Sequence, residues 1–329
     1  MRILIGLLGF ALSLNSFAIS EINYKENFDK LVAPFYNSGQ TETLAARDGV
    51  KLSYHKINQG KKKLIFMMAG RTEAVSKYAE VVYDLKDEGY DFLLLDSRGQ
   101  GLSERELGDI QKGWVKSYKK YITDIEDLFK GLKLKENYEE IVFLGHSMGA
   151  AIGLRYAEVN PKSFSKIVVN SPMIELKLDD KNETVVAMYM RLKVLTGAGT
   201  DYIPGGGPTT EEYPFENNRV THSPARFEMA RELERENPEL IMGSATVKWV
   251  LEGIKMGRKT YKKRKKLYKT PMLMFQAGIE HFSRYKRQDK ICKEHPKCEK
   301  VLIKEGKHEL LQEKDEIRSQ VISKIKAFL

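Results

Sequence analysis

Apolar residues gather in short uninterrupted runs along much of the chain. Runs such as "KKLIFMMAG", "YDFLLLD" and "EEIVFLG" hold few polar positions between flanking charges and glycines. A strand that is buried on both faces of a sheet has this continuous apolar pattern. We therefore predict buried strands in six ranges: 62–70, 90–103, 139–145, 164–172, 270–278 and 300–306. The range 90–103 begins as a strand and continues into a glycine-rich loop.

Between these runs, apolar residues recur three and four positions apart, which is typical of helices packed on a sheet. The helices predicted in this way cover 73–89, 117–135, 150–161 and 315–329. Before them, "LAARDGVKLSYHKIN" predicts a β-hairpin that turns at Asp48-Gly49. Strands that alternate with helices predict the α/β class, with a mostly parallel central sheet and helices on both faces.

The range 173–255 interrupts this alternation, since it has helix-like patches but no clear buried strand. We predict a largely helical cap there, inserted over the carboxyl edge of the sheet, where such folds bind ligands. The predicted domains are a core of 19–172, the cap of 173–255 and a second part of the core at 256–329. A chain of 329 residues suits one large core that carries an inserted subdomain.

The first residues form a separate unit. "MRILIGLLGFALSLNSFA" has a basic Arg2, an apolar run from Ile3 to Leu14, and small residues at Ser16 and Ala18. This order is typical of a secretory signal peptide, and the run is shorter than the roughly 20 residues of a spanning helix. We expect an exported protein, periplasmic or secreted. An uncleaved segment that keeps the protein at the membrane is the alternative.

The full chain carries a formal net charge of +10, and in the run 257–270 eight of fourteen residues are Lys or Arg. Basic runs bind nucleic acid or anionic lipid headgroups, the latter at roughly 1 kcal/mol per residue near a membrane surface. Because an exported chain meets lipid more readily, we expect peripheral contact with an anionic membrane through 257–270 and no nucleic-acid partner. A solvated helix face is the alternative.

The chain has two cysteines, Cys292 and Cys298, separated by five residues. Export to an oxidising compartment favours a disulfide between them. Two free thiols are the alternative. With His295 as the one histidine between them, the pair is too sparse for a convincing metal site, and we expect no metal.

The segment "GHSMG", from Gly145 to Gly149, is a candidate catalytic motif. It matches G-x-S-x-G and lies between a predicted strand and a predicted helix. In this motif the serine lies on a sharp turn, where side chains at the two glycine positions would collide with neighbouring backbone. The turn exposes the hydroxyl, and the N–H groups of the following helix face a developing oxyanion. We predict Ser147 as a nucleophile; an idle serine in a tight turn is the alternative.

A nucleophilic serine needs a base, and the base needs an orienting carboxylate. His308 follows the last predicted strand, so it falls at the same sheet edge as Ser147. In this motif's fold the acid comes between serine and histidine, and Glu280 follows the strand 270–278 at that edge. We predict the triad Ser147, Glu280 and His308. The alternatives are Glu175, Asp179 and Asp289 for the acid and His281 for the base.

Two backbone donors are needed for the oxyanion. The N–H of Met148 follows the nucleophile directly, and Arg71 lies in the loop after the strand 62–70. We predict these two N–H groups as the oxyanion hole.

Six segments, in this order, carry a resemblance to a known family: "AGRTEAVSKYAEVVYDL", "DSRGQGLSER", "GHSMGA", "VTHSPARFE", "QAGIEHF" and "GKHELLQEKDEIRSQV". They resemble the bacterial lysophospholipase and monoacylglycerol lipase branch of the α/β-hydrolase superfamily, from about residue 27 to 329. The resemblance implies the α/β-hydrolase fold and cleavage of the ester of a single-acyl glycerolipid through an acyl-enzyme intermediate. It implies the same triad at matching positions and no metal or organic cofactor. Relatives often carry Asp as the acid, so Glu280 is a departure.

Substrate choice is expected to lie in the cap. Its apolar residues either line an acyl channel or pack as plain core: Val185, Val186, Met188, Tyr189, Met190 and Leu192. Two other functions remain open, a carboxylesterase for short soluble esters and a non-catalytic membrane-surface binding protein built on the same fold.

Overall fold

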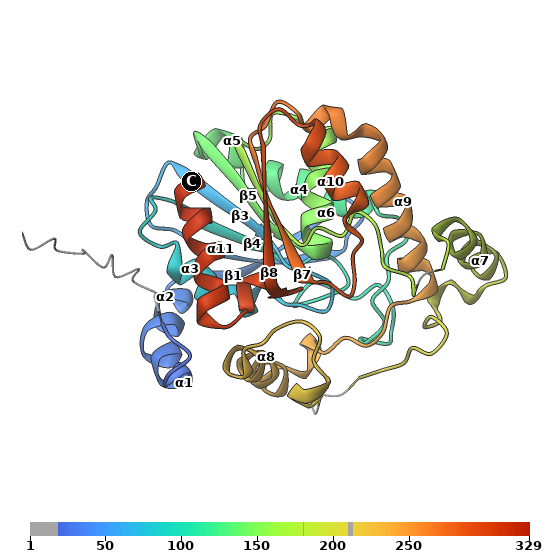
Figure 1. Cartoon of the computed structure of the whole chain (residues 1–329), viewed down its shortest axis with the longest axis horizontal. Coiled ribbons are helices and arrows are strands. Elements are labelled where there is room, and N and C mark those ends of the chain that lie inside the picture. The colour runs from blue at the N-terminus through green and yellow to red at the C-terminus, as the bar shows by residue number, and fades with distance from the viewer. Residues whose placement is uncertain (1–18, 180, 210–212) are drawn as a thin grey trace, which may run out of the picture.

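A computed structural model describes residues 19–179, 181–209 and 213–329. The predicted signal peptide of residues 1–18 lies outside the described residues. One eight-stranded sheet, in the order β1-β2-β4-β3-β5-β6-β7-β8, forms the centre of the molecule (Figure 1). Its strands are β1 (Gln40–Ala45), β2 (Lys51–Ile57), β3 (Lys63–Met68), β4 (Asp91–Leu95), β5 (Glu140–His146), β6 (Lys166–Asn170), β7 (Met272–Ile279) and β8 (Cys298–Lys307).

From β4 to β8 every neighbouring pair of strands is parallel, and the β1–β2 hairpin joins β4 in antiparallel fashion. The hairpin turns at Gly49, which has a φ of +89°. The predicted α/β class, the mostly parallel sheet and all the predicted strands are therefore confirmed.

Helices cover both faces of the sheet (Figure 1). They are α1 (Tyr24–Asn27), α2 (Ala33–Asn37), α3 (Ala79–Asp84), α4 (Lys119–Gly131), α5 (Leu134–Asn137), α6 (Ser147–Val159), α7 (Glu183–Leu195), α8 (Pro224–Glu236), α9 (Val247–Lys263), α10 (Tyr285–Glu294) and α11 (Asp315–Phe328). Single turns of other helix types are η1 (Phe28–Val32), η2 (Val75–Tyr78), η3 (Ala198–Thr200), η4 (Phe215–Asn217), η5 (Pro238–Leu240), η6 (Arg264–Leu267) and η7 (Leu310–Gln312). Among the described residues, no helix has both the length and the apolar character that crossing a bilayer requires.

The alternation of side chains along each strand builds two cores. Leu64, Phe66 and Met68 of β3 join the core under α4, α6, α9 and α10, whereas Ile65 and Met67 join the core under α3 and α11. Both sets are almost fully buried. Because successive strand residues point to opposite faces, an unbroken apolar run is what a sheet covered on both sides requires.

Two helical features differ from the sequence-based expectation. The predicted helix 73–89 is shorter in the structure, since η2 and α3 end at Asp84 and Gly89 follows with a φ of +84°. The helix α10 was not predicted, because it has few apolar residues and one of its three buried residues, Gln288, is polar; the other two are Ile291 and Cys292.

The predicted cap boundary at 255 falls inside α9. Trp249, Val250 and Ile254 of α9 share one core with residues of both α6 and α7. This helix therefore packs on the predicted cap and on the predicted core alike, and the domain limits stay a prediction.

Candidate active site

Ser147 lies at the junction between β5 and α6, in a left-handed backbone conformation with a φ of +47°. Few non-glycine residues adopt this conformation without a compensating structural reason. A Cβ at Gly149 would lie 2.5 Å from the carbonyl oxygens of Met68 and Ala69, and one at Gly145 would lie 2.8 Å from the Cα of Ala150. The two glycines therefore permit the sharp turn on which the serine lies.

The imidazole of His308 reaches this serine from the loop after β8. Its Nε2 lies 2.9 Å from the Ser147 Oγ. The backbone carbonyl of His308 accepts hydrogen bonds from the Ser171 hydroxyl, at 2.9 Å, and from the His146 Nε2, at 3.2 Å. These contacts fix the loop, so that the histidine ring is held against the hydroxyl.

Glu280, in the loop after β7, binds the other side of the same ring. Its Oε2 lies 2.7 Å from the His308 Nδ1, and its Oε1 accepts N–H bonds from Phe282 at 2.7 Å and from Ser283 at 3.3 Å. Burial disfavours the charged carboxylate, but the contact with His308 and the two N–H donors outweigh it and lower the Glu280 pKa. The carboxylate is therefore ionised at neutral pH and orients the imidazole.

The other acids considered from the sequence lie elsewhere. Glu175 pairs with Arg287 at 3.5 Å, and Asp289 bonds Lys300 at 2.6 Å. Asp179 lies in a left-handed turn of the cap. Among the described residues, Glu280 is thus the carboxylate that contacts the ring of His308.

The remaining histidines are also placed. His281 is exposed at the rim of the site. His55, His222 and His295 bond residues remote from it, at Thr41, Glu313 and the Lys297 N–H respectively.

The predicted oxyanion donors come from the start of α6 and from the loop after β3. Met148 is the second residue of α6, and the first N–H groups of a helix have no partner within that helix. Among the described residues, the Arg71 N–H donates none of the turn and loop hydrogen bonds. The preceding Gly70 N–H donates to the Glu73 carboxylate, which holds the loop in place.

A buried cluster around Glu73 was missed at the sequence level. Its carboxylate accepts hydrogen bonds from the Tyr78 hydroxyl at 2.7 Å and from the His146 Nδ1 at 3.0 Å, while Lys77 bridges it to Glu309. Burial opposes both charges, but Lys77 and His146 lower the Glu73 pKa and Glu73 raises that of His146. His146 therefore connects the oxyanion loop to the loop of His308. Nothing in the spacing of these residues along the chain indicated the cluster.

A cavity of about 310 Å³ opens directly onto Ser147 and His308. Its apolar lining comes from the loops around the cap and from α9: Met173, Leu176, Leu178, Ile203, Val220, Ala245, Trp249 and Val250. The wall is long and mostly apolar, which suits a hydrocarbon chain.

The residues of α7 do not line this cavity, so of the two alternatives for these residues the structure does not support the acyl channel. Val186 and Met190, four positions apart, are buried toward α9. The opposite face of α7 is exposed, and it consists of Val185, Met188, Tyr189, Leu192 and Leu195.

The basic run 257–270 covers the end of α9 and η6. Its lysines are exposed, whereas Arg264 is paired with Glu294 at 2.8 Å. Trp249 at the cavity and Lys263 at the end of α9 are roughly 20 Å apart along the helix, at 1.5 Å per residue. The exposed lysines at the end of α9 and in η6 thus lie far from Ser147.

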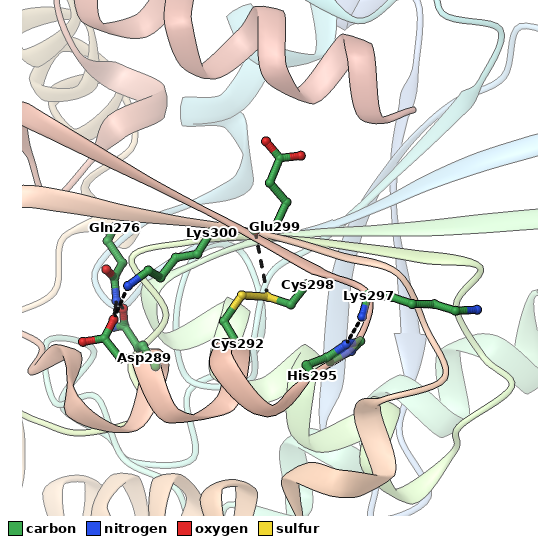
Figure 2. The surroundings of a disulfide bond; sticks show 9 residues. Gln276, Asp289, Cys292, His295, Lys297, Cys298, Glu299 and Lys300 are labelled. Carbon is green, nitrogen blue, oxygen red and sulfur yellow. Dashed lines mark hydrogen bonds and ion pairs between the residues drawn. A yellow bond between two sulfur atoms is a disulfide. The ribbon is translucent and has the colours of Figure 1, made fainter.

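Cys292 of α10 and Cys298 of β8 form a disulfide (Figure 2). The bond ties the end of α10 to the start of β8, the strand that leads to His308. His295 lies in the loop between them, where its Nδ1 accepts the Lys297 N–H at 3.0 Å. Among the described residues, no group of three or more candidate ligands could hold a metal ion.

Comparisons with known proteins match almost the whole chain. Residues 59–315 match the family described as serine aminopeptidase, S33. The chain is 31% identical over 304 residues to a probable lysophospholipase L2 of Haemophilus influenzae, covering 90% of this chain and 94% of that protein. It is 29% identical to lysophospholipase L2 of Escherichia coli K12, covering 81% and 80%. A soluble variant of the Saccharomyces cerevisiae monoglyceride lipase has the same fold, with a TM-score of 0.67 at 17% identity, covering 88% of this chain and 95% of that one.

Proposed function

Since this chain belongs to the α/β-hydrolase family described as serine aminopeptidase S33, we propose that it is a carboxylic ester hydrolase of single-acyl glycerolipids. Its substrates are lysophospholipids or monoacylglycerols. The observation that carries the proposal is the hydrogen-bonded series Ser147, His308 and Glu280 beside an apolar cavity. The names of the two lysophospholipase relatives support the class of lipid ester.

The geometry supports acyl transfer in two steps. His308 takes the Ser147 proton as the hydroxyl oxygen attacks the ester carbonyl, and the N–H groups of Arg71 and Met148 face the oxyanion. His308 then gives that proton to the departing glycerol oxygen, which leaves an acyl-serine. In the second step His308 takes a proton from water, the hydroxide attacks the acyl carbonyl, and the fatty acid leaves as Ser147 regains its proton. Glu280 stays ionised and stabilises the imidazolium.

A fluorophosphonate probe tests the nucleophile directly. Wild type should be labelled, and Ser147→Ala should not be. Labelling of neither protein would favour a non-catalytic binding protein on this fold, and labelling of both would show that the reactive nucleophile is a residue other than Ser147.

A substrate panel tests the lipid class. We expect monoacylglycerols or lysophospholipids with long chains to be cleaved far better than p-nitrophenyl acetate or an aminoacyl p-nitroanilide. A strong preference for acetate would favour a short-chain carboxylesterase, and a preference for the anilide would favour a peptidase.

The proposal extends to location. An N-terminal segment of signal-peptide composition and a disulfide both support an exported protein, periplasmic or secreted. The exposed lysines of 257–270 support peripheral contact with anionic lipid. Fractionation of cells that express the full chain tests the location, and a cytoplasmic protein with intact residues 1–18 would contradict it.

A further inference from the structure

Arg71, a cationic residue, lines the cavity beside Ser147. Its Nη2 donates to the Gly243 carbonyl at 2.7 Å, and its guanidinium lies 5.1 Å from the centre of the Trp249 ring. The Nε is buried and has no hydrogen-bond partner. No carboxylate of the described residues forms an ion pair with this arginine.

Arg71 is partly buried, and the three fully buried arginines of the described chain are all paired. Arg98 contacts Asp48 and Asp124, Arg226 contacts Glu80 and Asp315, and Arg318 contacts Glu80 and Asp84. An unpaired buried charge is costly, so proteins usually supply a counterion. Burial does lower the Arg71 pKa, to about 10, but the group remains charged at neutral pH. The missing counterion therefore points to an anionic ligand.

A second group without a partner belongs to the segment next to the cavity. The Tyr202 hydroxyl is buried and has no hydrogen-bond partner, and the following residue, Ile203, lines the cavity together with Arg71. Arg71 belongs to the loop after β3, whereas Tyr202 belongs to the cap. The Arg71 guanidinium by itself supplies several hydrogen-bond donors and one positive charge, which is the chemistry of a phosphate site.

We propose that the Arg71 guanidinium binds the phosphate of a lysophospholipid, a conclusion that rests on the function proposed above. The backbone N–H of Arg71 is the second oxyanion donor in the mechanism proposed above, and its guanidinium lies one side-chain length from that N–H. In a lysophospholipid, only the glycerol backbone separates the ester from the phosphate. One residue therefore serves the ester oxygen and the headgroup. A monoacylglycerol offers a neutral hydroxyl there, which leaves the buried charge uncompensated.

A neighbouring cavity of about 530 Å³ contains the residue that serves as a control for Arg71, namely Arg219. It also contains cationic residues, but Lys77 is paired with Glu73 and Glu309, and Arg231 is paired with Glu234. Arg219 is exposed to solvent and lacks an ion pair with any described residue. Because water already solvates Arg219, this second cavity has less need of an anion than the site at Arg71.

The test compares kcat/KM for a lysophosphatidylglycerol and for a monoacylglycerol of the same acyl chain. Arg71→Met should lower the ratio of these two values at least about 30-fold, since a charge-assisted hydrogen-bonded contact is lost. Arg219→Met removes the same charge and should change the ratio less than about threefold. Arg71→Lys should restore part of the preference. An unchanged ratio in Arg71→Met would make this arginine a structural tie to Gly243, and a selective loss in Arg219→Met would place the phosphate in the second cavity.

Binding measurements separate this inference from the function on which it rests. In a Ser147→Ala background, calorimetry at millimolar concentration should detect sn-glycerol 3-phosphate but not glycerol, with at least tenfold weaker binding after Arg71→Met. No binding to the Ser147→Ala protein, or equal binding by both proteins, overturns the phosphate site. If wild type cleaves no single-acyl lipid and glycerol phosphate still binds through Arg71, the proposed function fails while the anion site stands.

Discussion

The His308 Nε2 lies 2.9 Å from the Ser147 Oγ, although the two residues are 161 positions apart in the chain. Parallel strands explain this proximity, because β5 and β8 end at the same edge of the sheet. Each residue follows its strand directly, so its position depends on the rigid sheet rather than on a long loop.

Replacing Glu280 by Ala should lower kcat by about 10²–10⁴-fold, because the imidazole loses its orienting carboxylate and the partner of its charged form. KM should change much less. Asp289→Ala, in the same region of the chain but bonded to Lys300, is the matched control and should keep nearly full turnover. Steady-state kinetics on one lipid ester measures both. Near-normal turnover in the Glu280 variant would contradict the assignment.

The turn at the nucleophile predicts a strong glycine requirement. Gly149→Ala places a Cβ against the carbonyl oxygens of Met68 and Ala69, and should cost about 1–3 kcal/mol of unfolding free energy and most activity. Gly108→Ala is the control, since no atom lies within 4 Å of its Cβ position. In urea unfolding, the unfolding free energy of the Gly108→Ala variant should stay within about 1 kcal/mol of the wild-type value. Equal stability of both variants would show that the turn relaxes easily.

Asp96 predicts a specific dependence of stability on pH. Its buried carboxylate accepts the Val75 and Leu102 N–H groups, and burial raises its pKa to about 6. Between about pH 4 and 6 the unfolded chain ionises while the folded chain stays protonated, so folding loses stability as pH rises. Relative to Asp96→Asn, wild type should lose about 2–3 kcal/mol across this window. Urea unfolding of both proteins at about pH 4 and about pH 6 measures this loss. Equal changes of unfolding free energy with pH in the two proteins would contradict the prediction.

The disulfide predicts a modest and selective stabilisation. Because it closes a short loop, its removal in Cys292→Ser/Cys298→Ser should cost about 2 kcal/mol. Dithiothreitol should lower the unfolding free energy of wild type by a similar amount. It should leave the unfolding free energy of the double variant unchanged. Lipid ester hydrolysis should persist in the folded variant. A reductant effect of equal size on both proteins would indicate another cause.

Membrane contact is testable by vesicle sedimentation. Neutralising Lys262, Lys263, Lys265 and Lys266 should weaken binding to anionic vesicles and reduce its dependence on salt. The variant Met188→Ser/Leu192→Ser removes apolar side chains from the exposed face of α7. It tests whether this face adds a contribution to vesicle binding that does not depend on salt. If only the α7 variant loses binding, the basic run is a solvated surface.

Much of this protein could be inferred from short stretches of its sequence. Continuous apolar runs indicated the buried strands, because a strand covered on both faces has no solvent-facing position. The glycines at 145 and 149 indicated the turn at Ser147, since their requirement is local steric exclusion. The placement of His308 and Glu280 after strands followed from the common edge of a parallel sheet.

Other features were decided only by tertiary packing. Whether α7 lines a channel depends on which of its faces meets α9, and α9 packs on both α6 and α7. The charges of Glu73 and His146 are compensated by neighbours from different loops, whereas Arg71 lacks such a neighbour in the described chain. Burial and ion pairing depend on residues distant in sequence, so no local pattern records them.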